Sequence, residues 1–449
     1  MNTLFAKAPI KQVYFKLAFP VVLGMITTMV YNLVDTMFVA KTGDANLVAA
    51  VTISTPLINF LIAFSDILGL GGSSVISRLF GEKKYEEARR VSSFSIYAGI
   101  ITSFILTAIL FVFEKQILWL FGARASTYAD AAEFYRVLAI GAVFIMCSLI
   151  PQNLLRTEGL AVEAMIGSIS GTVVAIILDP VFLFVLKMGA TGVATANIIG
   201  FIVTDSVLFY YMIKRAKFIN AKVKFMKVKS HLFNEVIAIG IPSSVNQFAN
   251  TFGMALLNST LAAYGAKEVA AMGITQKIYS IVILAIVGFT FGSQPLIGFN
   301  YGAKNWQRLK EVLRFDIFVQ VVYAIVSALI LIVFAHQIVG LFMNDSLIIN
   351  SGSYMLLATL ITTPLAGIIM VYTTVFQSIG NAWGALIMSL ARQGIVYLLA
   401  MIVLQRFLGL HGIVWAQAAS DVITFTIGYV IFSKSLNLKA KIMKEQNNN

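Results

Sequence analysis

Long, nearly uninterrupted apolar runs are the feature that most limits what this chain can fold into. One of them, from Ile96 to Phe113, reads IYAGIITSFILTAILFVF. A helix needs about 20 mainly apolar residues to cross the hydrocarbon core of a membrane. Only 12% of the residues are charged, against roughly 25% in soluble domains. Continuous runs, rather than short alternating segments, favour helices over a membrane β-barrel. The sequence therefore predicts an all-α membrane protein and excludes a water-soluble globule.

Charge clusters and Gly, Pro or Asn residues divide the apolar runs into twelve predicted transmembrane helices. The predicted spans are 14–38, 47–72, 91–113, 131–155, 161–186, 190–212, 236–260, 268–293, 311–334, 349–376, 382–404 and 410–433. The first span lacks a small-residue cleavage site behind a short hydrophobic region, so we expect it to be retained as a membrane helix.

Lys and Arg residues are concentrated in alternate connections between these spans. The segments 78–90, 214–229 and 304–314 are rich in them, whereas the intervening connections hold few. Because cytoplasmic loops carry such an excess, we expect both termini in the cytoplasm and a multi-pass protein of the inner membrane. Basic loops beside the anionic inner leaflet explain the net charge of +13 without a nucleic-acid partner.

The second half of the chain repeats the first at a constant offset, the one that separates Gly159 from Gly380. At the same offset the segment RLFGEKKYEEARRV aligns with GFNYGAKNWQRLKEV, and Pro20 aligns with Pro242 after a slip of one position. Each half has an even number of spans, so both halves have the same orientation, as in transporters built from parallel repeats. We predict two pseudo-symmetric six-helix bundles, 1–212 and 236–449, joined by a cytoplasmic linker at 213–235, with a basic cytoplasmic tail at the end of the second.

Two acidic residues within the predicted spans are candidates for ion coupling. Asp35 lies several residues before the outer end of the first span, with Thr28 and Tyr31 at helical spacings from it. Asp179 precedes Pro180, which removes a helical hydrogen bond and leaves carbonyl groups near the carboxyl group. Charge in hydrocarbon is costly, and ionisable groups retained there usually carry function. We therefore expect Asp35 to act as a proton carrier.

The other ionisable residues within the spans receive weaker assignments. Asp66 and Asp205 favour a structural role, and the second half contributes Asp316 near an inner end and Asp421 in the last span. Ion coupling is accordingly expected in the N-terminal bundle. The sequence assigns no single role to Arg136, Lys277 and Arg392, which can serve as charge partners, as groups that repel substrate or as snorkelling side chains.

The sequence lacks the motifs that several other kinds of chemistry require. The single cysteine, Cys147, excludes an internal disulfide and a Cys-rich metal site, and the three histidines have no metal-binding spacing. The glycines at 69–72 are not followed by a phosphate-binding lysine motif. We predict that the protein is not an enzyme and holds no cofactor or metal, and that it either takes its energy from a gradient or uses none.

The duplication, the RLFGEKKYEEARRV loop, Asp35 and the ILDP segment at 177–180 together resemble the multidrug and toxic compound extrusion (MATE) transporters. The resemblance covers residues 11–434 and implies two six-helix bundles that export organic cations in exchange for H⁺ or Na⁺. Asp35 is similar to the first-helix acid of the DinF-like branch. The resemblance matches four further residues to the polar cluster around that acid: Tyr135, Asn153, Asp179 and Asn197. Two positions depart from the family pattern, which often has Asn at Ala175 and commonly Thr at Asn197.

The resulting hypothesis is a monomeric secondary antiporter that exports lipophilic or cationic drug-like compounds by alternating access. Asp35 takes up an external proton, or the site takes Na⁺, and Pro20 and Gly24 provide weak points where the first helix can bend. One rival is a flippase for lipids or lipid-linked saccharides, which the same apolar helices would suit. Another is an ion channel, but the sequence has neither pore-lining polar rings nor a filter loop.

Overall fold

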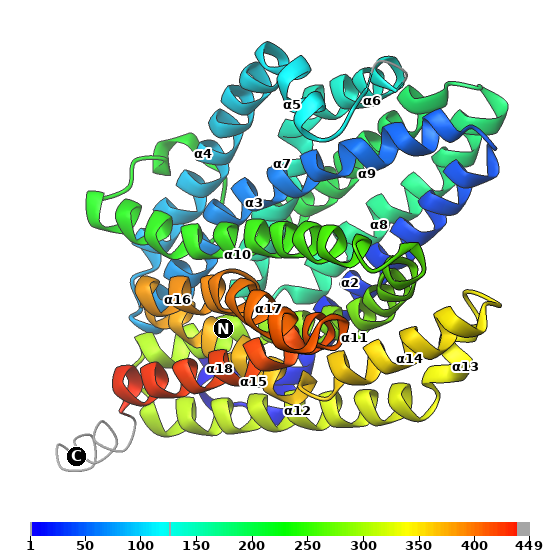
Figure 1. Ribbon diagram of the computed structural model, residues 1–449. Coiled ribbons are helices and arrows are strands. Elements are labelled where there is room, and N and C mark those ends of the chain that lie inside the picture. Colours follow the sequence, from blue (N-terminus) through cyan, green and yellow to red (C-terminus); the bar gives the residue numbers. More distant parts are fainter. Residues whose placement is uncertain (1, 125–126, 438–449) are drawn as a thin grey trace. The chain divides into compact units, whose positions relative to one another are not determined.

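The computed structural model describes residues 2–124 and 127–437, and all the regular elements in these two stretches are helices (Figure 1). The chain divides into two compact units. Unit 1 comprises Phe19–Ser244, and unit 2 combines Asn2–Ala18 with the chain from Val245 onward. The predicted bundle and linker boundaries remain a prediction, and the predicted basic tail lies, from residue 438 on, outside the described residues.

Unit 1 is built from seven helices of its own together with parts of two long helices. Its own helices are α3 (Ala45–Gly81), α4 (Tyr85–Val112), α5 (Glu114–Leu120), α6 (Tyr128–Ile140), α7 (Ala142–Thr157), α8 (Ala161–Pro180) and α9 (Gly189–Lys214). A π-helical turn, η1 (Val181–Val185), continues α8, and a 3₁₀ turn, η2 (Val223–Phe225), lies in the segment after α9.

Unit 2 has the same plan. Its own helices are α1 (Asn2–Lys7), α11 (Ala266–Gly302), α12 (Trp306–Val333), α13 (Ala335–Gly340), α14 (Ser346–Leu360), α15 (Thr363–Ile379), α16 (Ala382–Gln393), α17 (Ile395–Leu408) and α18 (Leu410–Leu436). The internal repeat is visible in these bounds, because α3 and α11, and likewise α4 and α12, begin and end at the same offset that separates Gly159 from Gly380.

Two long helices change unit part-way along their length. In α2 (Ile10–Lys41) the change follows Ala18, just before Pro20; in α10 (Ser230–Ala262) it follows Ser244, just after Pro242. A proline inside a helix lacks the N–H that would bond to the preceding turn. Each half of the chain therefore contributes part of its first helix to the other unit: residues 10–18 of α2 belong to unit 2, and residues 230–244 of α10 belong to unit 1. A proline lies close to the residue at which each helix changes unit.

Glycines allow these two contributed helix segments to pack closely against the unit that receives them. Gly71 on α3 has no room for a side chain, because a Cβ there would meet the backbone of Val236 on α10. Gly292 on α11, its counterpart in the repeat, would likewise meet the backbone of Ala18 on α2. Gly71 and Gly292 are equivalent positions of the repeat, one within each unit, and each lies where two helix backbones come together so closely that only glycine fits.

Among the described residues, nine helices are long and apolar enough to cross a membrane, and two bent helix pairs raise the number to as many as eleven. The bent pairs are α6 with α7, at 49°, and α14 with α15, at 43°. They occupy the predicted spans 131–155 and 349–376, which the sequence shows as single apolar runs. The predicted span 236–260 falls on α10, which is continuous but is not among these candidates. An all-helical, multi-span membrane protein is confirmed.

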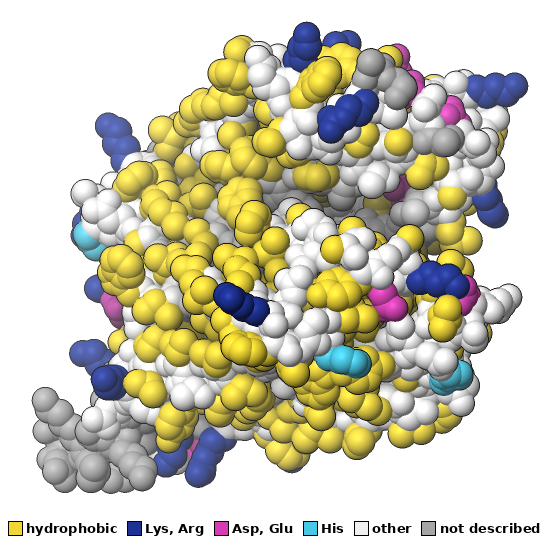
Figure 2. Space-filling model, in the orientation of Figure 1, with side chains coloured by type: hydrophobic (Ala, Val, Ile, Leu, Met, Phe, Trp, Pro, Cys, Tyr) yellow, Lys and Arg dark blue, Asp and Glu magenta, His cyan; other side chains and the backbone are white. Residues whose placement is uncertain are grey.

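The surface is that of a protein surrounded by hydrocarbon. Large apolar side chains on α4 and α12 are more than half exposed, among them Phe104, Val112, Phe318 and Val333. Figure 2 shows hydrophobic side chains over most of the visible face and few charged ones. Such apolar exposure would be an aggregation hazard in water and is the expected state of a lipid-facing helix.

Two of the cations without an assigned role have carboxylate partners. Arg136 donates to both carboxylate oxygens of Glu114, each at 2.8 Å. Arg392, which is 4% exposed, donates from Nε to Asp421 at 3.1 Å and from Nη2 to the hydroxyl of Tyr279 at 3.0 Å. Asp421 also accepts from Thr362 and Gln417. Both arginines are charge partners, whereas the side chain of Lys277 is exposed.

We predict that Arg392→Met strongly destabilises the protein, because it leaves the buried Asp421 carboxylate without its cation. Removing one member of such a pair costs about 3–5 kcal/mol. The double variant Arg392→Met/Asp421→Leu should recover at least half of the loss, as measured by thermal unfolding of the purified protein. A double variant no more stable than Arg392→Met would contradict the assignment.

The Glu114–Arg136 pair predicts a pH-dependent contribution to stability. Its hydrogen bonds to Arg136 hold the pKa of the Glu114 carboxyl below its ordinary value. A lowered pKa means that the stabilisation is present above the unfolded-state pKa of about 4.3 and is lost as the pH falls through the folded-state value. Glu114→Gln should lower the melting temperature by roughly 2 °C at pH 7. The gap should close below pH 4; a gap that persists there would exclude this origin.

Candidate functional site

The centre of the candidate site is a pair of carboxyl groups from two helices of unit 1. Asp35 on α2 and Asp179 at the end of α8 interact directly through their side chains. Asp179 is fully buried, and among the described residues neither of its oxygens has a hydrogen-bond donor; the same holds for Oδ1 of Asp35. Two carboxyl groups can form a hydrogen bond only if one carries a proton. We call these two residues the acid pair.

Local sequence explains how Asp179 reaches this position. Pro180 ends the regular α-helix, and the chain continues as the π-helical turn η1, closed by the bond from Leu186 N–H to the Val181 carbonyl at 2.9 Å. π-Helical turns are rare and often occur at functional sites. One turn before Asp179, Ala175 is buried and offers no polar side-chain atom. The acid pair therefore has no amide donor from that position.

Tyr31 and Asn197 form the polar side of the site. The Tyr31 hydroxyl donates to Oδ1 of Asn197 at 2.7 Å, and the Asn197 amide donates to the carbonyl of Val193 at 3.1 Å. Tyr31 lies within electrostatic reach of both members of the acid pair. From the sequence alone, Tyr31 is recognisable only as a neighbour of Asp35 on the same helix. The helical spacing between them, which places both on one helix face, is the signal that identifies it as part of the site.

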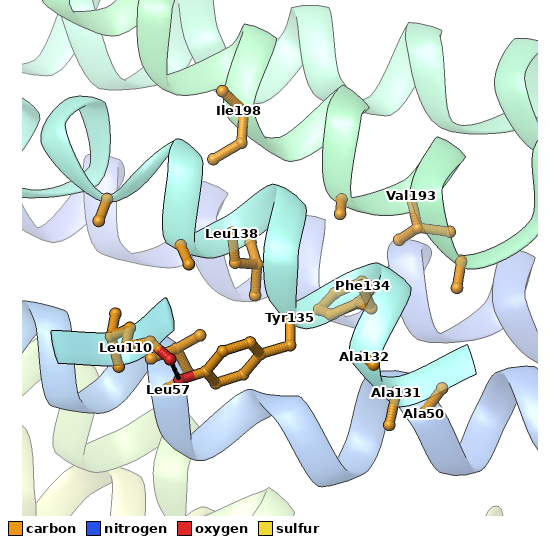
Figure 3. Packing of buried hydrophobic residues seen from close by; sticks show 14 of the residues in the cluster. Ala50, Leu57, Leu110, Ala131, Ala132, Phe134, Tyr135, Leu138, Val193 and Ile198 are labelled. Carbon is orange, nitrogen blue, oxygen red and sulfur yellow. Dashed lines mark hydrogen bonds between the residues drawn. The ribbon is translucent and has the colours of Figure 1, made fainter. Parts of the chain in front are cut away.

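Tyr135 lies in an apolar environment. It is fully buried on α6 within a hydrophobic cluster of unit 1, and its hydroxyl donates to the carbonyl of Leu110 at 2.9 Å. Figure 3 shows the ring among apolar side chains, with the hydroxyl directed at Leu110. The phenolic proton is therefore donated to a backbone carbonyl near the end of α4 and not to the acid pair. A role for Tyr135 in coupling remains a prediction.

Asn153 belongs to a different polar group of unit 1. Its Oδ1 accepts from Arg156 at 3.1 Å, one turn along α7. Arg156 is buried and interacts electrostatically with Asp66 on α3. The structure thus places Asn153 with an arginine and a further acid, and it gives Asp66, for which the sequence favours a structural role, a charge partner in Arg156.

The predicted bending positions lie on the segment of α2 that precedes the acid pair. Pro20 is internal to the helix, which runs without a break from Ile10 to Lys41. A Cβ at Gly24 would lie 3.3 Å from the Ser168 hydroxyl on α8, so the glycine lets α2 approach the helix that carries Asp179. Helix bending at these two residues remains a prediction.

The buried acids of unit 2 differ from the acid pair in their hydrogen bonding. Asp316 accepts from the Tyr14 hydroxyl at 2.7 Å and from Ser293 at 2.8 Å, and Asp421 has the partners described above. In unit 1, by contrast, Asp205 resembles the acid pair in having a buried oxygen without a donor among the described residues. In unit 2 one oxygen of Glu268 is also buried without a donor, but its other oxygen accepts from Ser351 at 3.1 Å. The acid pair lies in unit 1, where the sequence predicts ion coupling.

Comparison with known proteins assigns the family. The MatE family matches residues 20–181 and again residues 242–402, well over half of the chain. The chain belongs to the MatE family. The second match is displaced from the first by the offset of the internal repeat, to within one position at its start. Membership confirms the predicted resemblance at family level and identifies a transporter family and not an enzyme.

A curated relative and two solved structures extend this comparison. The multidrug export protein MepA of Staphylococcus saprophyticus is 28% identical over 93% of this chain and 92% of its own length. An outward-facing multidrug resistance MATE family transporter of the MOP superfamily has a TM-score of 0.91, with 24% identity over 98% of both chains. A Pyrococcus furiosus transporter, described as having a binding pocket of reverse polarity, has a TM-score of 0.88 at 24% identity over 98% of both chains. These structures confirm the MATE fold.

We predict opposite effects for the amide substitution of two buried acids. Asp179→Asn replaces a buried carboxyl group whose oxygens have no donor, so the free energy of unfolding at pH 8 should be unchanged or higher. Asp316→Asn breaks hydrogen bonds to a carboxylate and should cost about 2 kcal/mol. Thermal unfolding of both variants, side by side, measures the difference. Equal losses would show that Asp179 has donors of its own.

Proposed function

We propose that this protein is a secondary multidrug antiporter that exports lipophilic or cationic organic compounds in exchange for protons, through protonation of the acid pair. The observation that carries the proposal is the direct interaction of the half-buried Asp35 carboxyl group with the fully buried Asp179 carboxyl group, whose two oxygens have no donor among the described residues. Export of drugs is the activity named for the MepA relative. We place the chain in the DinF-like branch because of Asp35, and in the inner membrane as a monomer with both termini in the cytoplasm.

The coupling step follows from the chemistry of two adjacent carboxyl groups. With a proton on one of them, the pair is joined by a hydrogen bond. Without it, two negative charges repel each other at short range. Proton binding therefore changes the force between α2 and α8, which carry Asp35 and Asp179. We propose that α2 responds by bending near Pro20 and Gly24, because Pro20 lacks the N–H of a regular helical hydrogen bond and glycine is conformationally permissive.

The oxygen atoms available around the acid pair favour H⁺ over Na⁺ as the coupling ion. A sodium ion requires several oxygen ligands at once, and the amide oxygen of Asn197 already accepts from Tyr31. Ala175 contributes no side-chain oxygen one turn before Asp179. A proton needs only the two carboxyl groups. Exchange of one proton for one monovalent cation is electrically neutral, so a pH gradient should drive export and a membrane potential alone should not.

We predict that Asp35→Asn abolishes proton-coupled export. Purified protein in liposomes should expel an ethidium-type cation under an imposed pH gradient, whereas the variant should not, because the amide cannot take up a proton. Asp205→Asn is the matched control: it neutralises another buried acid of unit 1 outside the acid pair and should retain export.

Three outcomes of that experiment would change the proposal. Full proton-coupled export by Asp35→Asn would remove the acid pair from the mechanism. Export driven by an imposed Na⁺ gradient and not by a pH gradient would replace the coupling ion. Translocation of fluorescent lipids, without export of the cation, would favour a flippase for lipids or lipid-linked saccharides.

A further inference from the structure

Unit 2 contains a pocket with an unusually polar lining for a membrane protein. It lies among α10, α11, α16, α17 and α18, and its polar lining residues are Asn250, Gln276, Tyr279, Gln393, Tyr397 and Gln417. The enclosed space is about 30 Å³, within a crevice of about 360 Å³ including its open mouth. An enclosed space of this size holds about two water molecules. It would also admit one small polar group of a larger molecule.

The internal repeat makes this pocket the counterpart of the acid pair. With the one-position slip of the first helices, Thr28, Tyr31 and Asp35 of α2 correspond to Asn250, Gly253 and Leu257 of α10. Asn250, Gly253 and Leu257 all line the pocket. The counterpart of Asp179, at the offset that separates Gly159 from Gly380, is Ala400.

The counterparts of both acids are therefore apolar. Leu257 and Ala400 pack in one hydrophobic cluster together with Tyr397. The counterparts of the acid pair carry no carboxyl group, and amide side chains of α10, α11, α16 and α18 line the pocket instead.

The pocket can form hydrogen bonds but carries no free charge. The Arg392–Asp421 ion pair beside it is internally neutral and holds two of the lining residues: Gln417 donates to Asp421, and the Tyr279 hydroxyl accepts from Arg392. Among the described residues, the Asn250 and Gln393 side chains have no hydrogen-bond partner, and the Gln276 amide has only a weak contact, 3.8 Å to the Met272 sulfur. An amide offers two donors and an acceptor.

We infer that this pocket is a substrate subsite that binds a neutral hydrogen-bonding group, such as an aryl amine or a carbonyl, carried by the exported compound. The inference rests on the proposed function and assigns different tasks to the two halves of the duplication. Unit 1 keeps the carboxyl groups and binds the proton. Unit 2 has exchanged them for amides and recognises an uncharged polar part of the substrate, while the Tyr279 and Tyr397 rings provide flat apolar contact.

The inference is tested by equilibrium binding of two dyes of equal charge to the full-length protein in detergent. The dyes are ethidium, which carries two ring amino groups, and the same phenanthridinium cation without them. We expect the wild type to bind ethidium about tenfold more tightly, since each hydrogen bond is worth roughly two- to tenfold in affinity. Gln276→Leu and Gln393→Leu should each weaken ethidium binding about fivefold and leave the amine-free dye unaffected.

Controls separate recognition from misfolding and from the proposed antiport. Gln337→Leu, an exposed amide on α13 outside the pocket, should bind both dyes as the wild type does. Unchanged binding of the amine-free dye shows that each pocket variant is folded. A wild type that binds both dyes equally, or neither, overturns the inference, as do pocket variants that weaken both dyes alike or neither. Absence of proton-driven export by the wild type would instead overturn the proposed function and leave this dye selectivity standing.

Discussion

The cost of leaving a polar group without a partner in hydrocarbon governs this structure. It requires the chain to be helical, because a helix satisfies its own backbone groups, and it explains why Asp316, Asp421 and Arg392 are surrounded by hydrogen-bond partners. Against that background the acid pair is an exception. Asp179 is completely buried and yet has no donor among the described residues. An ionisable group kept in such a place marks a candidate functional site.

Much of the fold could be predicted from the sequence, because the apolar runs and the constant offset of the repeat are direct physical signatures. The helix bounds of the two units follow that offset closely. The sequence could not show the bends within 131–155 and 349–376, since Gly141 and the threonines at 362–363 lie inside runs of uniform hydropathy. Nor could it show that α2 and α10 each belong to both units, because a helix that changes unit has the same local sequence pattern as one that does not.

The candidate site was only partly predictable. Asp35 and Asp179 were identified by their cost in hydrocarbon, but their contact depends on how α2 packs on α8, which neither residue's local sequence encodes. Tyr135 and Asn153 were assigned to the site by family resemblance alone, and the structure places their polar atoms on Leu110 and Arg156. Leu110 lies on a different helix from Tyr135, and Arg156 lies one turn from Asn153. A comparison of motifs does not show such contacts. The branch of the family also remains a proposal.

The exchange of first helices between the units has a consequence for how the protein is made. Residues 2–18 are synthesised before unit 1 but belong to unit 2, whose remaining helices are synthesised after it. Unit 1, for its part, stays incomplete until the opening turns of α10 have emerged. Unit 1 is one uninterrupted stretch of nascent chain, whereas unit 2 is not, so the amino-terminal segment must wait in the bilayer for a docking surface that is translated only after unit 1.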